Sequence, residues 1–381
     1  MPEANSVARI FSEHFRCAPD FLLFAPSLVN LMGEHTDYNQ GLQILSTLSR
    51  GVWAGFSPRA DNQLQLACNF FPDEPRSWEL CALVAQDSEF DWSNILRSLT
   101  EQLYSRFSLP IGLNLYLHCQ LPASAGFSLI YSLLYATAAA LLQANQQAFE
   151  AKALADLCWD VKRRHGRLDP TNAKPWVIAS GQAGYAYLHD AQQHQLTPLP
   201  INPAWQFFVI DLGEPKQFLD SAIAQRTVQC QTAAHALGIA HLSELSLAQL
   251  EREKVNLEEI IYKRARHVVS ENARCQQMIQ LLGGTDMAAL AQCCAQSQRS
   301  LQQDYDVTTE RLDRWVSQLK NTFGDSIAVR LNGGGFGGSL VLITNRLDGD
   351  ALQAQVKAVL PELCLLPVRP AGAQLTRFAK S

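Results

Sequence analysis

The sequence lacks any long apolar run. No stretch approaches the roughly 18 consecutive apolar residues that a membrane-spanning helix needs. The opening segment, MPEANSVARIFSEHF, carries charged residues early and contains no apolar core of signal-peptide length. We therefore expect no membrane partner and a cytoplasmic location.

Clustered cysteines are also missing. The ten cysteines are scattered, only Cys293 and Cys294 are close in sequence, and there is no Cys-x-x-Cys pair and no Cys/His group at zinc spacing. They are expected to be small buried apolar residues. Free thiols in this number suit a reducing compartment, in agreement with the expected location.

The sequence has no excess of basic residues. The formal net charge is −5 and the isoelectric point is about 6.0. Nothing forms the basic stripe that binding to nucleic acid requires, so no nucleic-acid partner is expected. The composition indicates neither a protein partner nor an oligomeric state.

The length of the chain and the order of its predicted strands and helices indicate an α+β protein in two parts. With 381 residues, of which 47% are hydrophobic and 18% charged, the chain is long enough for two globular cores. Strands dominate first, helices next and strands again at the end. We expect an N-terminal domain over residues 1–200 and a C-terminal domain over 201–381, and the last segment could pack back on the first domain.

Apolar periodicity predicts the elements in order. The expected helices span residues 5–16, 92–107, 128–145, 149–166 and 351–360, with further helices from about 216 to 321. The expected strands span residues 42–49, 51–59, 62–70, 112–121, 205–213 and both sides of a glycine turn within 326–344. Residues 167–205 hold five prolines and are predicted to be loop.

The glycine turn, RLNGGGFGGSLVLIT, satisfies the spacing G-x-G-x-x-G at Gly333, Gly335 and Gly338. A dinucleotide-binding fingerprint would open a helix, whereas SLVLIT predicts a strand. Five glycines around Phe336 exceed what a hairpin needs, so we expect close approach to another segment or to a ligand. A merely flexible hairpin tip is the alternative.

A second polar segment, MGEHTDYNQG, follows a strand-like apolar run. It sets Glu34, His35, Asp37 and Asn39 within six positions of one another. Carboxylates accept hydrogen bonds from hydroxyls, and an imidazole donates or accepts, which suits a polyhydroxyl ligand such as a sugar. An N-capping turn, with Thr36 or Asp37 as the cap of a short helix, explains the same residues. The residues alone leave both interpretations open.

Together these segments resemble the galactokinases, within the GHMP kinase superfamily. MGEHTDYNQG is similar to the family's first motif, and RLNGGGFGGSLVLI is similar to its glycine-rich third motif. RARHVVSE (264–271) and SQRSLQQDYDV (297–307) also look like galactokinase. The motifs stand in the family's order, and the resemblance covers nearly the whole chain.

The resemblance implies a two-domain GHMP kinase fold, with an N-terminal domain like part of a ribosomal protein and a ferredoxin-like C-terminal domain. It implies phosphorylation of a sugar's anomeric hydroxyl by ATP and Mg²⁺ between the domains. Carried over, Glu34, His35 and Asp37 would contact sugar hydroxyls. The glycine hairpin would lie near the sugar and the phosphates; its residues are Gly333, Gly334, Gly335, Phe336 and Gly337.

Several departures from the family fall on its chemistry. The family's first motif begins Ala-Pro-Gly-Arg, but here the arginine position holds Leu28. The phosphate loop reads PASAGFSLI, in which Ser124, Gly126 and Ser128 remain of a loop that should be rich in glycine and serine. Ile130 stands where the family has a serine that helps hold Mg²⁺.

When the family's other catalytic positions are aligned with this sequence without gaps, two of them are occupied by lysine. Lys162 takes the position of the metal-binding glutamate and Lys174 that of the catalytic aspartate, while Ile223 replaces a sugar-packing tyrosine. Phosphoryl transfer needs positive charge on the moving group and a residue that orients or deprotonates the nucleophile. A lysine, with a pKa near 10, cannot take a proton at neutral pH unless burial lowers that pKa by roughly three units.

Three hypotheses follow. The first is a galactokinase-like pseudokinase that binds a sugar or small molecule or acts in regulation, without ATP or Mg²⁺; its ligand would be galactose or an acidic sugar, with Lys174 among the binding residues. The second is an active galactokinase with rearranged groups, which would use ATP and Mg²⁺. The third is a fold kept for protein–protein contact, which Leu28, Phe127, Leu129 and Ile130 would favour if they filled the cleft.

Overall fold

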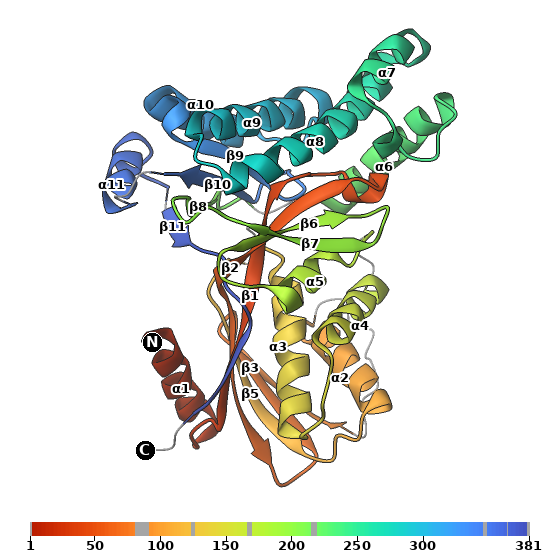
Figure 1. Cartoon of the computed structure of the whole chain (residues 1–381). Helices are drawn as coiled ribbons and strands as arrows, with labels where there is room; N and C mark the ends of the chain where they lie inside the picture. Colours follow the sequence, from red (N-terminus) through yellow and green to blue (C-terminus); the bar gives the residue numbers. More distant parts are fainter. Residues whose placement is uncertain are drawn as a thin grey trace.

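The structure is a computed structural model that describes residues 2–80, 91–122, 126–165, 170–214, 219–345, 349–363 and 365–378. Figure 1 shows two stacked parts: a long twisted sheet with helices on both faces, and a smaller sheet under a layer of helices. Helix α1 and the last described residues lie along the same face of the first part. Ser124 of the predicted phosphate loop falls outside the described residues.

The helices are α1 (Pro2–Phe15), α2 (Asn94–Arg106), α3 (Leu129–Ala144), α4 (Ala151–Arg164), α5 (Ala173–Ser180), α6 (Leu219–Ala236), α7 (Leu247–Glu253), α8 (Glu259–Gly283), α9 (Met287–Ser300), α10 (Glu310–Phe323) and α11 (Gly349–Val359). The strands are β1 (Phe21–Met32), β2 (Leu42–Arg59), β3 (Gln63–Cys68), β4 (Phe71–Glu79), β5 (Gly112–Cys119), β6 (Tyr185–Asp190), β7 (Gln195–Pro200), β8 (Gln206–Asp211), β9 (Ala328–Asn332), β10 (Ser339–Thr344), β11 (Leu365–Val368) and β12 (Gln374–Arg377).

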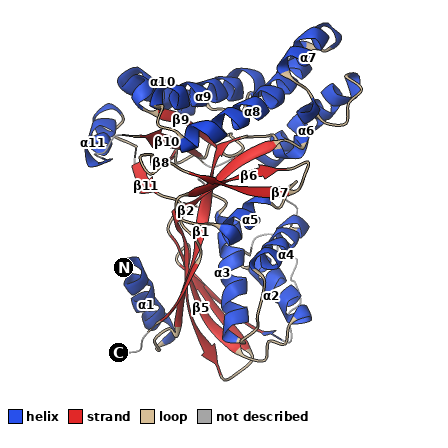
Figure 2. Cartoon of the chain, in the orientation of Figure 1, coloured by secondary structure: helices blue, strands red, loops and turns tan. Residues whose placement is uncertain are grey.

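The first sheet has eight strands, in the order β12-β1-β2-β5-β3-β4, with β6 pairing β2 and β7 pairing β6. Only β3 and β5 run parallel; the other pairs are antiparallel. The strands predicted at 42–49 and 51–59 form one strand, β2, which serves both halves of this sheet. Figure 2 shows α1 on one face and α2, α3 and α4 on the other.

The prediction of loop over residues 167–205 is wrong, because this segment contains α5, β6 and β7. Pro198 and Pro200 lie in β7, which pairs only with β6 and so forms an edge. An edge strand tolerates proline because one side of it needs no N–H donors. Pro175 lies in the first turn of α5, where the backbone N–H has no partner within the helix.

The second sheet has the order β11-β8-β10-β9 and is wholly antiparallel. The helices predicted between 216 and 321 are confirmed as α6 to α10, with a π-helical turn over Leu301–Tyr305. The last strand, β12, returns to the first sheet and pairs with β1. Within the residues that the structure describes, no helix combines the length and the apolar character needed to cross a bilayer.

Four apolar clusters of buried side chains lie in the described part of the chain, one of them between α1 and the first sheet. Another fills the space between the first sheet and α2 to α5, and a third lies between the second sheet and its helices. The fourth contains Leu31 and Ile44 of the first sheet together with Val209 and Val341 of the second. The two parts are therefore joined by buried side chains, which fixes the seam between them. Of the eight cysteines described, seven are buried and none forms a disulfide, as predicted.

Candidate functional site

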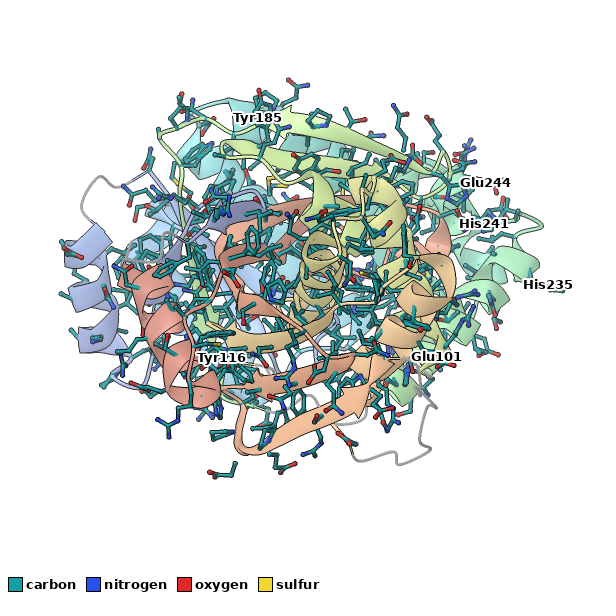
Figure 3. The ribbon with its side chains drawn as sticks, turned by 90° about the horizontal axis from the view of Figure 1, so that it is seen from below. Glu101, Tyr116, Tyr185, His235, His241 and Glu244 are labelled. Carbon is teal, nitrogen blue, oxygen red and sulfur yellow. The ribbon has the colours of Figure 1, made fainter. Side chains whose placement is uncertain are left out.

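A cavity of about 180 Å³ lies at this seam. Its wall draws on the end of β1 and the turn after it, on β2, on the start of α3 and on α4, α5 and α6, as well as on the glycine turn between β9 and β10. The titratable residues that Figure 3 labels at the outer edge, among them Glu101, His235 and Glu244, do not line it.

The structure brings most of the predicted site residues to this one cavity. Those that line it are Leu28, Glu34, His35, Asp37, Gly126, Ser128, Lys162, Lys174, Gly333 and Gly334. Those that do not line it are Ile130, Gly335, Phe336 and Gly337. Ile223, at the family's tyrosine position, is a lining residue as well.

Glu34 connects the two domains. Its carboxylate is buried, with Oε1 accepting from the backbone N–H of Gly333 at 2.7 Å and Oε2 accepting from the Asn30 amide at 2.9 Å. Asn30 in turn uses its backbone N–H to donate to the Asn332 amide oxygen at 2.9 Å. The bonds with Gly333 and Asn332 join the end of β1 and the turn after it to the end of β9 and the glycine turn between β9 and β10.

His35 is the most constrained residue of the motif. It is 4% exposed and has φ of +64°, a backbone region that non-glycine residues rarely adopt and that clusters at functional sites. Its Nδ1 lies 3.0 Å from the hydroxyl of Tyr38. Burial lowers its pKa well below the usual value, and the charges of His267 and Arg226 lower it further. The imidazole is therefore neutral at physiological pH.

Two buried polar atoms at the cavity wall lack a hydrogen bond. They are Nε2 of His35 and Oε1 of Gln43, and neither has a partner of good geometry among the described residues. The backbone of Gly334 lies near enough to His35 to raise its pKa slightly, but it does not meet hydrogen-bond geometry. Leaving a buried polar group unsatisfied costs about 1–3 kcal/mol, so these atoms are prepared for a polar ligand.

The capping interpretation of this motif is only partly met. A short 3₁₀ helix, Asp37–Asn39, does follow Thr36, but no side chain caps it. The Thr36 hydroxyl instead donates to backbone carbonyls of Gly33 and Leu42. Asp37 accepts from the N–H of Tyr38 at 3.1 Å, and it lines the cavity.

The glycine turn approaches another segment closely, as expected. Phe336 donates its N–H to the carbonyl of Val307 at 2.8 Å. A Cβ atom on Gly335 would lie 2.1 Å from that same carbonyl oxygen, and its φ of +84° also requires glycine. The dinucleotide interpretation is excluded, because β10 follows the turn. This contact keeps Gly333 and Gly334 at the cavity wall.

A buried ionic network supports Glu34 from behind. Arg330 of β9 is fully buried, with guanidinium nitrogens 3.7 Å from Glu34 and 3.6 Å from Glu271. Glu271 also accepts from Arg274 at 2.7 Å and from the N–H of Gly33 at 3.1 Å. Burial raises the pKa of Glu271, but the charges of Arg274 and Arg330 outweigh it and lower that pKa to about 2.

The two later segments that resemble galactokinase meet behind His35. His267 of α8 lies between the backbone carbonyl of Glu34, 3.1 Å from Nε2, and the hydroxyl of Ser300, 2.9 Å from Nδ1. The rings of His35 and His267 lie 4.7 and 4.4 Å from that of Tyr305. Burial lowers the pKa of His267 to about 4, so it too is neutral.

Apolar residues surround the loop before α3, which the resemblance places on the phosphate side of the site. Leu28, Phe127 and Leu129 are buried within apolar clusters. Leu28 donates its backbone N–H to the carbonyl of Phe127 at 3.1 Å, so this loop residue packs directly on the strand that should carry the arginine. Ser128 begins α3 with φ of +55°, and its side chain makes no capping hydrogen bond.

The residues at the family's metal positions do not fit Mg²⁺. This ion prefers oxygen ligands, whereas Ile130 offers only carbon atoms and Lys162 a cation. Lys162 is 8% exposed, and its ammonium lies 5.1 Å from the centre of the Tyr131 ring. Among the residues described, no group of three or more His, Cys, Asp or Glu side chains could hold a metal ion.

Sequence reasoning missed several lining residues: Asn30, Tyr38, Gln43, Asp220 and Asn332. Gln43 is the one with a local signal, because a polar residue interrupts the apolar run at the start of β2. Asn30, Tyr38 and Asn332 belong to pairings across the domain seam, namely Asn30 with Asn332 and Tyr38 with Tyr305. Pairs separated by hundreds of residues have no pattern in a single sequence.

Comparison with known proteins agrees with this geometry. Residues 9–58 match the family model described as the galactokinase galactose-binding signature, and residues 278–362 match the model of the GHMP kinase C-terminal region. A galactokinase from Pasteurella multocida (strain Pm70) is 26% identical over 350 residues, which cover 90% of each chain.

Solved structures share the fold. Lactococcus lactis galactokinase, crystallised with galactose, superposes with a TM-score of 0.85 at 22% identity and covers 98% of this chain and 99% of its own. The mevalonate kinase of Methanococcus jannaschii gives 0.67 at 14% identity, covering 92% and 98%. The fold is thus the two-domain α+β fold of the GHMP kinases, and over most of its length this chain is similar to galactokinase.

Proposed function

We propose that this protein is a pseudokinase: it binds a hydroxyl-rich small molecule in the cavity and does not transfer phosphate to it. Ligand binding is supported by two polar atoms without a hydrogen bond among the described residues, Nε2 of His35 and Oε1 of Gln43. Both residues line the cavity, together with Glu34 and Asp37. A sugar hydroxyl both donates and accepts, so it satisfies an imidazole nitrogen and an amide oxygen alike. Galactose is the first candidate, because a structural relative was crystallised with it.

The chemistry of the lining residues supports the absence of phosphoryl transfer. A kinase neutralises the charge of the moving phosphoryl group with a metal and cationic side chains held at that group. Leu28 supplies no charge, and Lys162 repels the metal that the reaction needs. Lys174 stands where the resemblance places the catalytic aspartate, and an ammonium group has no acceptor for the proton of a sugar hydroxyl. A small-molecule sensor or regulator needs none of these groups.

The cavity volume favours one small ligand. About 180 Å³ is room for roughly six water molecules, at about 30 Å³ each, which is the scale of a single hexose. Pockets for larger ligands span about 300–1,000 Å³. Of Leu28, Phe127, Leu129 and Ile130, only Leu28 lines the cavity, and the presence of the cavity favours ligand binding over a fold kept for protein contacts alone.

Calorimetric titration with galactose, alongside a coupled assay of ADP release with galactose, ATP and Mg²⁺, tests the proposal. We expect binding that His35→Asn weakens at least tenfold, because a buried hydrogen bond is lost. His235→Asn, on the exposed face of α6, is the matched control and should bind as the parent does. ADP release should stay at background.

Two results would overturn the proposal. Robust ADP release that Lys174→Met abolishes would instead establish an active galactokinase with rearranged groups. Absence of binding by galactose and by its acidic derivatives would leave only the role in protein–protein contact.

A further inference from the structure

A buried histidine lies beside the cavity residue Gln43. His189 of β6 is 0% exposed, and neither of its ring nitrogens has a hydrogen-bond partner among the described residues. The strand pairing places His189 directly opposite Gln43 of β2, whose Oε1 also lacks a partner there. Two neighbouring side chains therefore hold three unsatisfied polar atoms, and one of the two side chains lines the cavity.

Both side chains point to the face of the sheet on which the cavity lies. Residues directly opposite each other in an antiparallel pair share a face, and so do residues two positions apart along a strand. Leu45, two positions after Gln43, lines the cavity. Tyr187, two positions before His189, donates its hydroxyl to the carbonyl of Ser180 at 2.6 Å. Helix α5, which ends at Ser180, therefore covers this part of the face.

Gln43 is the polar neighbour that His189 can reach across the strands. The residue opposite His189 on its other side is Leu196 of β7, which has no polar side-chain atom. Side chains directly opposite each other have Cβ atoms about 4.5–5.5 Å apart, and rotation about the side-chain torsions of a glutamine and a histidine bridges this gap.

The His189 imidazole has a donor for the amide oxygen of Gln43. Burial lowers the pKa of His189 to about 4; His194 lowers it further and Asp190 opposes the shift. The ring is therefore neutral at physiological pH, with one N–H donor and one acceptor nitrogen. Buried polar atoms without partners destabilise the folded protein, and an apolar pair at these positions would not. Residues that cost stability beside a ligand cavity are typical of function.

Resting on the proposed function, we propose that His189 is a positioning residue that makes the cavity specific for one hydroxyl of the sugar. When the sugar is bound, the N–H of His189 and that hydroxyl both donate to Oε1 of Gln43, a carbonyl oxygen with two acceptor positions. His189 thereby holds the amide with its oxygen available to the ligand. An amide oxygen accepts from a hydroxyl, so a sugar without a donor at this place loses the contact.

Calorimetric titration of the parent and of His189→Leu tests this inference. The probes are galactose, galacturonic acid and a set of monodeoxy galactoses, each of which lacks one hydroxyl. We expect His189→Leu to weaken galactose binding about three- to tenfold, the range of one hydrogen bond between neutral groups. The deoxy sugar that lacks the hydroxyl facing Gln43 should bind the parent and His189→Leu equally, and the other deoxy sugars should keep the difference.

Further measurements separate positioning from a structural role. His189→Leu should leave the melting temperature of the ligand-free protein unchanged or raise it, because leucine removes two unsatisfied polar atoms. In a Gln43→Leu background, His189→Leu should change no affinity. His118→Leu is the matched control, because His118 also lies in a strand of the first sheet and does not line the cavity. It should bind each sugar as the parent does.

Nitrogen NMR of the parent tests the same hydrogen bond without a substitution. Galactose or galacturonic acid, whichever binds, should change the chemical shifts of the His189 ring nitrogens, which report hydrogen bonding at each nitrogen. Unchanged shifts in the sugar-bound parent would overturn the inference, and this holds even if His189→Leu does not fold.

The outcomes of this test and of the test of the proposed function are distinct. A loss of affinity that is equal for galactose and every deoxy sugar would overturn the role of His189 and leave the sugar site standing. So would unchanged affinity in His189→Leu, or an effect of this substitution that persists in the Gln43→Leu background. Failure of both galactose and galacturonic acid to bind the parent would remove the proposed function itself.

Discussion

The side-chain hydroxyl of Tyr38 lies 2.7 Å from that of Tyr305, although 267 positions separate the two residues in the sequence. The same Tyr38 hydroxyl lies 3.0 Å from Nδ1 of His35, and the Tyr305 hydroxyl lies 3.3 Å from the thiol of Cys230. These contacts form a chain of buried polar groups that leads from the cavity wall into the C-terminal domain. The orientation of His35 therefore depends in part on Tyr305 and Cys230, which do not line the cavity.

Removing the hydroxyl of Tyr305 should loosen this chain. Tyr305→Phe removes the hydrogen bond between the hydroxyls of Tyr305 and Tyr38, and the contact between the Tyr38 hydroxyl and His35 remains. We expect the free energy of unfolding to fall by about 1–2 kcal/mol. Sugar affinity should fall several-fold, because the imidazole is held less firmly. Urea denaturation and calorimetric titration measure both effects. Tyr104→Phe, at an exposed position on α2, should change neither, and equal effects from the two variants would contradict the assigned role.

The contact between the glycine turn and Val307 makes a second prediction. Gly335→Ala places a Cβ atom 2.1 Å from the Val307 carbonyl oxygen, so the turn must move and Gly333 loses its position against Glu34. We expect a loss of several kcal/mol in unfolding free energy, since steric overlap adds to the cost of a positive φ. Gly184→Ala is the control, with a nearly equal φ of +82° and open space around it. It should cost only about 1 kcal/mol.

The helices were predictable because their apolar faces follow a local period. In α10 the buried residues Leu312, Trp315, Val316 and Leu319 recur at helical spacing, and Thr309 caps the first turn through the N–H of Leu312. The segment 167–205 was not predictable in this way. Its prolines indicate a loop when they are considered alone, and only the sheet topology shows that β7 is an edge strand on which they are tolerated.

The candidate site, too, contains residues that a local sequence pattern predicts and residues that only the tertiary structure brings together. Glu34, His35 and Asp37 stand within four positions of one another, so a single polar segment predicted them. The network behind Glu34 contains Arg330 and Glu271, which are 296 and 237 positions away from it in the sequence. The sequence did not predict their role, because charged residues in strands and helices are ordinarily exposed to solvent. Their complete burial arises from the packing of the two domains, which no local pattern encodes.

The depressed pKa of Glu271 predicts how stability depends on acid. Its pKa falls from 4.5 to about 2 on folding, so the stabilisation it supplies is present above pH 4.5 and is lost as the pH falls towards 2. Glu271→Gln removes the charge that Arg274 and Arg330 face, and should cost about 3–5 kcal/mol at pH 7. Denaturation from pH 7 to 2.5 should show the difference from the parent shrinking only below pH 4.5.

The control for that substitution is Glu259→Gln, in an exposed pair with Lys263 one helical turn away. Surface pairs of this kind contribute little, so this variant should be as stable as the parent at every pH tested. A gap between Glu271→Gln and the parent that stays constant through the acid range would show that Glu271 keeps its ordinary pKa in the folded protein.

His267 should act on stability in a higher pH range. Burial lowers its pKa from 6.5 to about 4, so the unfolded chain takes up a proton in this interval and the folded protein does not. Stability should therefore fall as the pH drops from about 6.5 to 4, by up to about 3 kcal/mol from this residue. His267→Gln removes the titrating group, and the slope of unfolding free energy against pH should decrease by about one proton in that interval. His235→Gln, at an exposed position on α6, is the matched control for replacement of a histidine by glutamine. If the slope of His267→Gln equals that of the parent, the ring is not buried in its neutral form between Glu34 and Ser300.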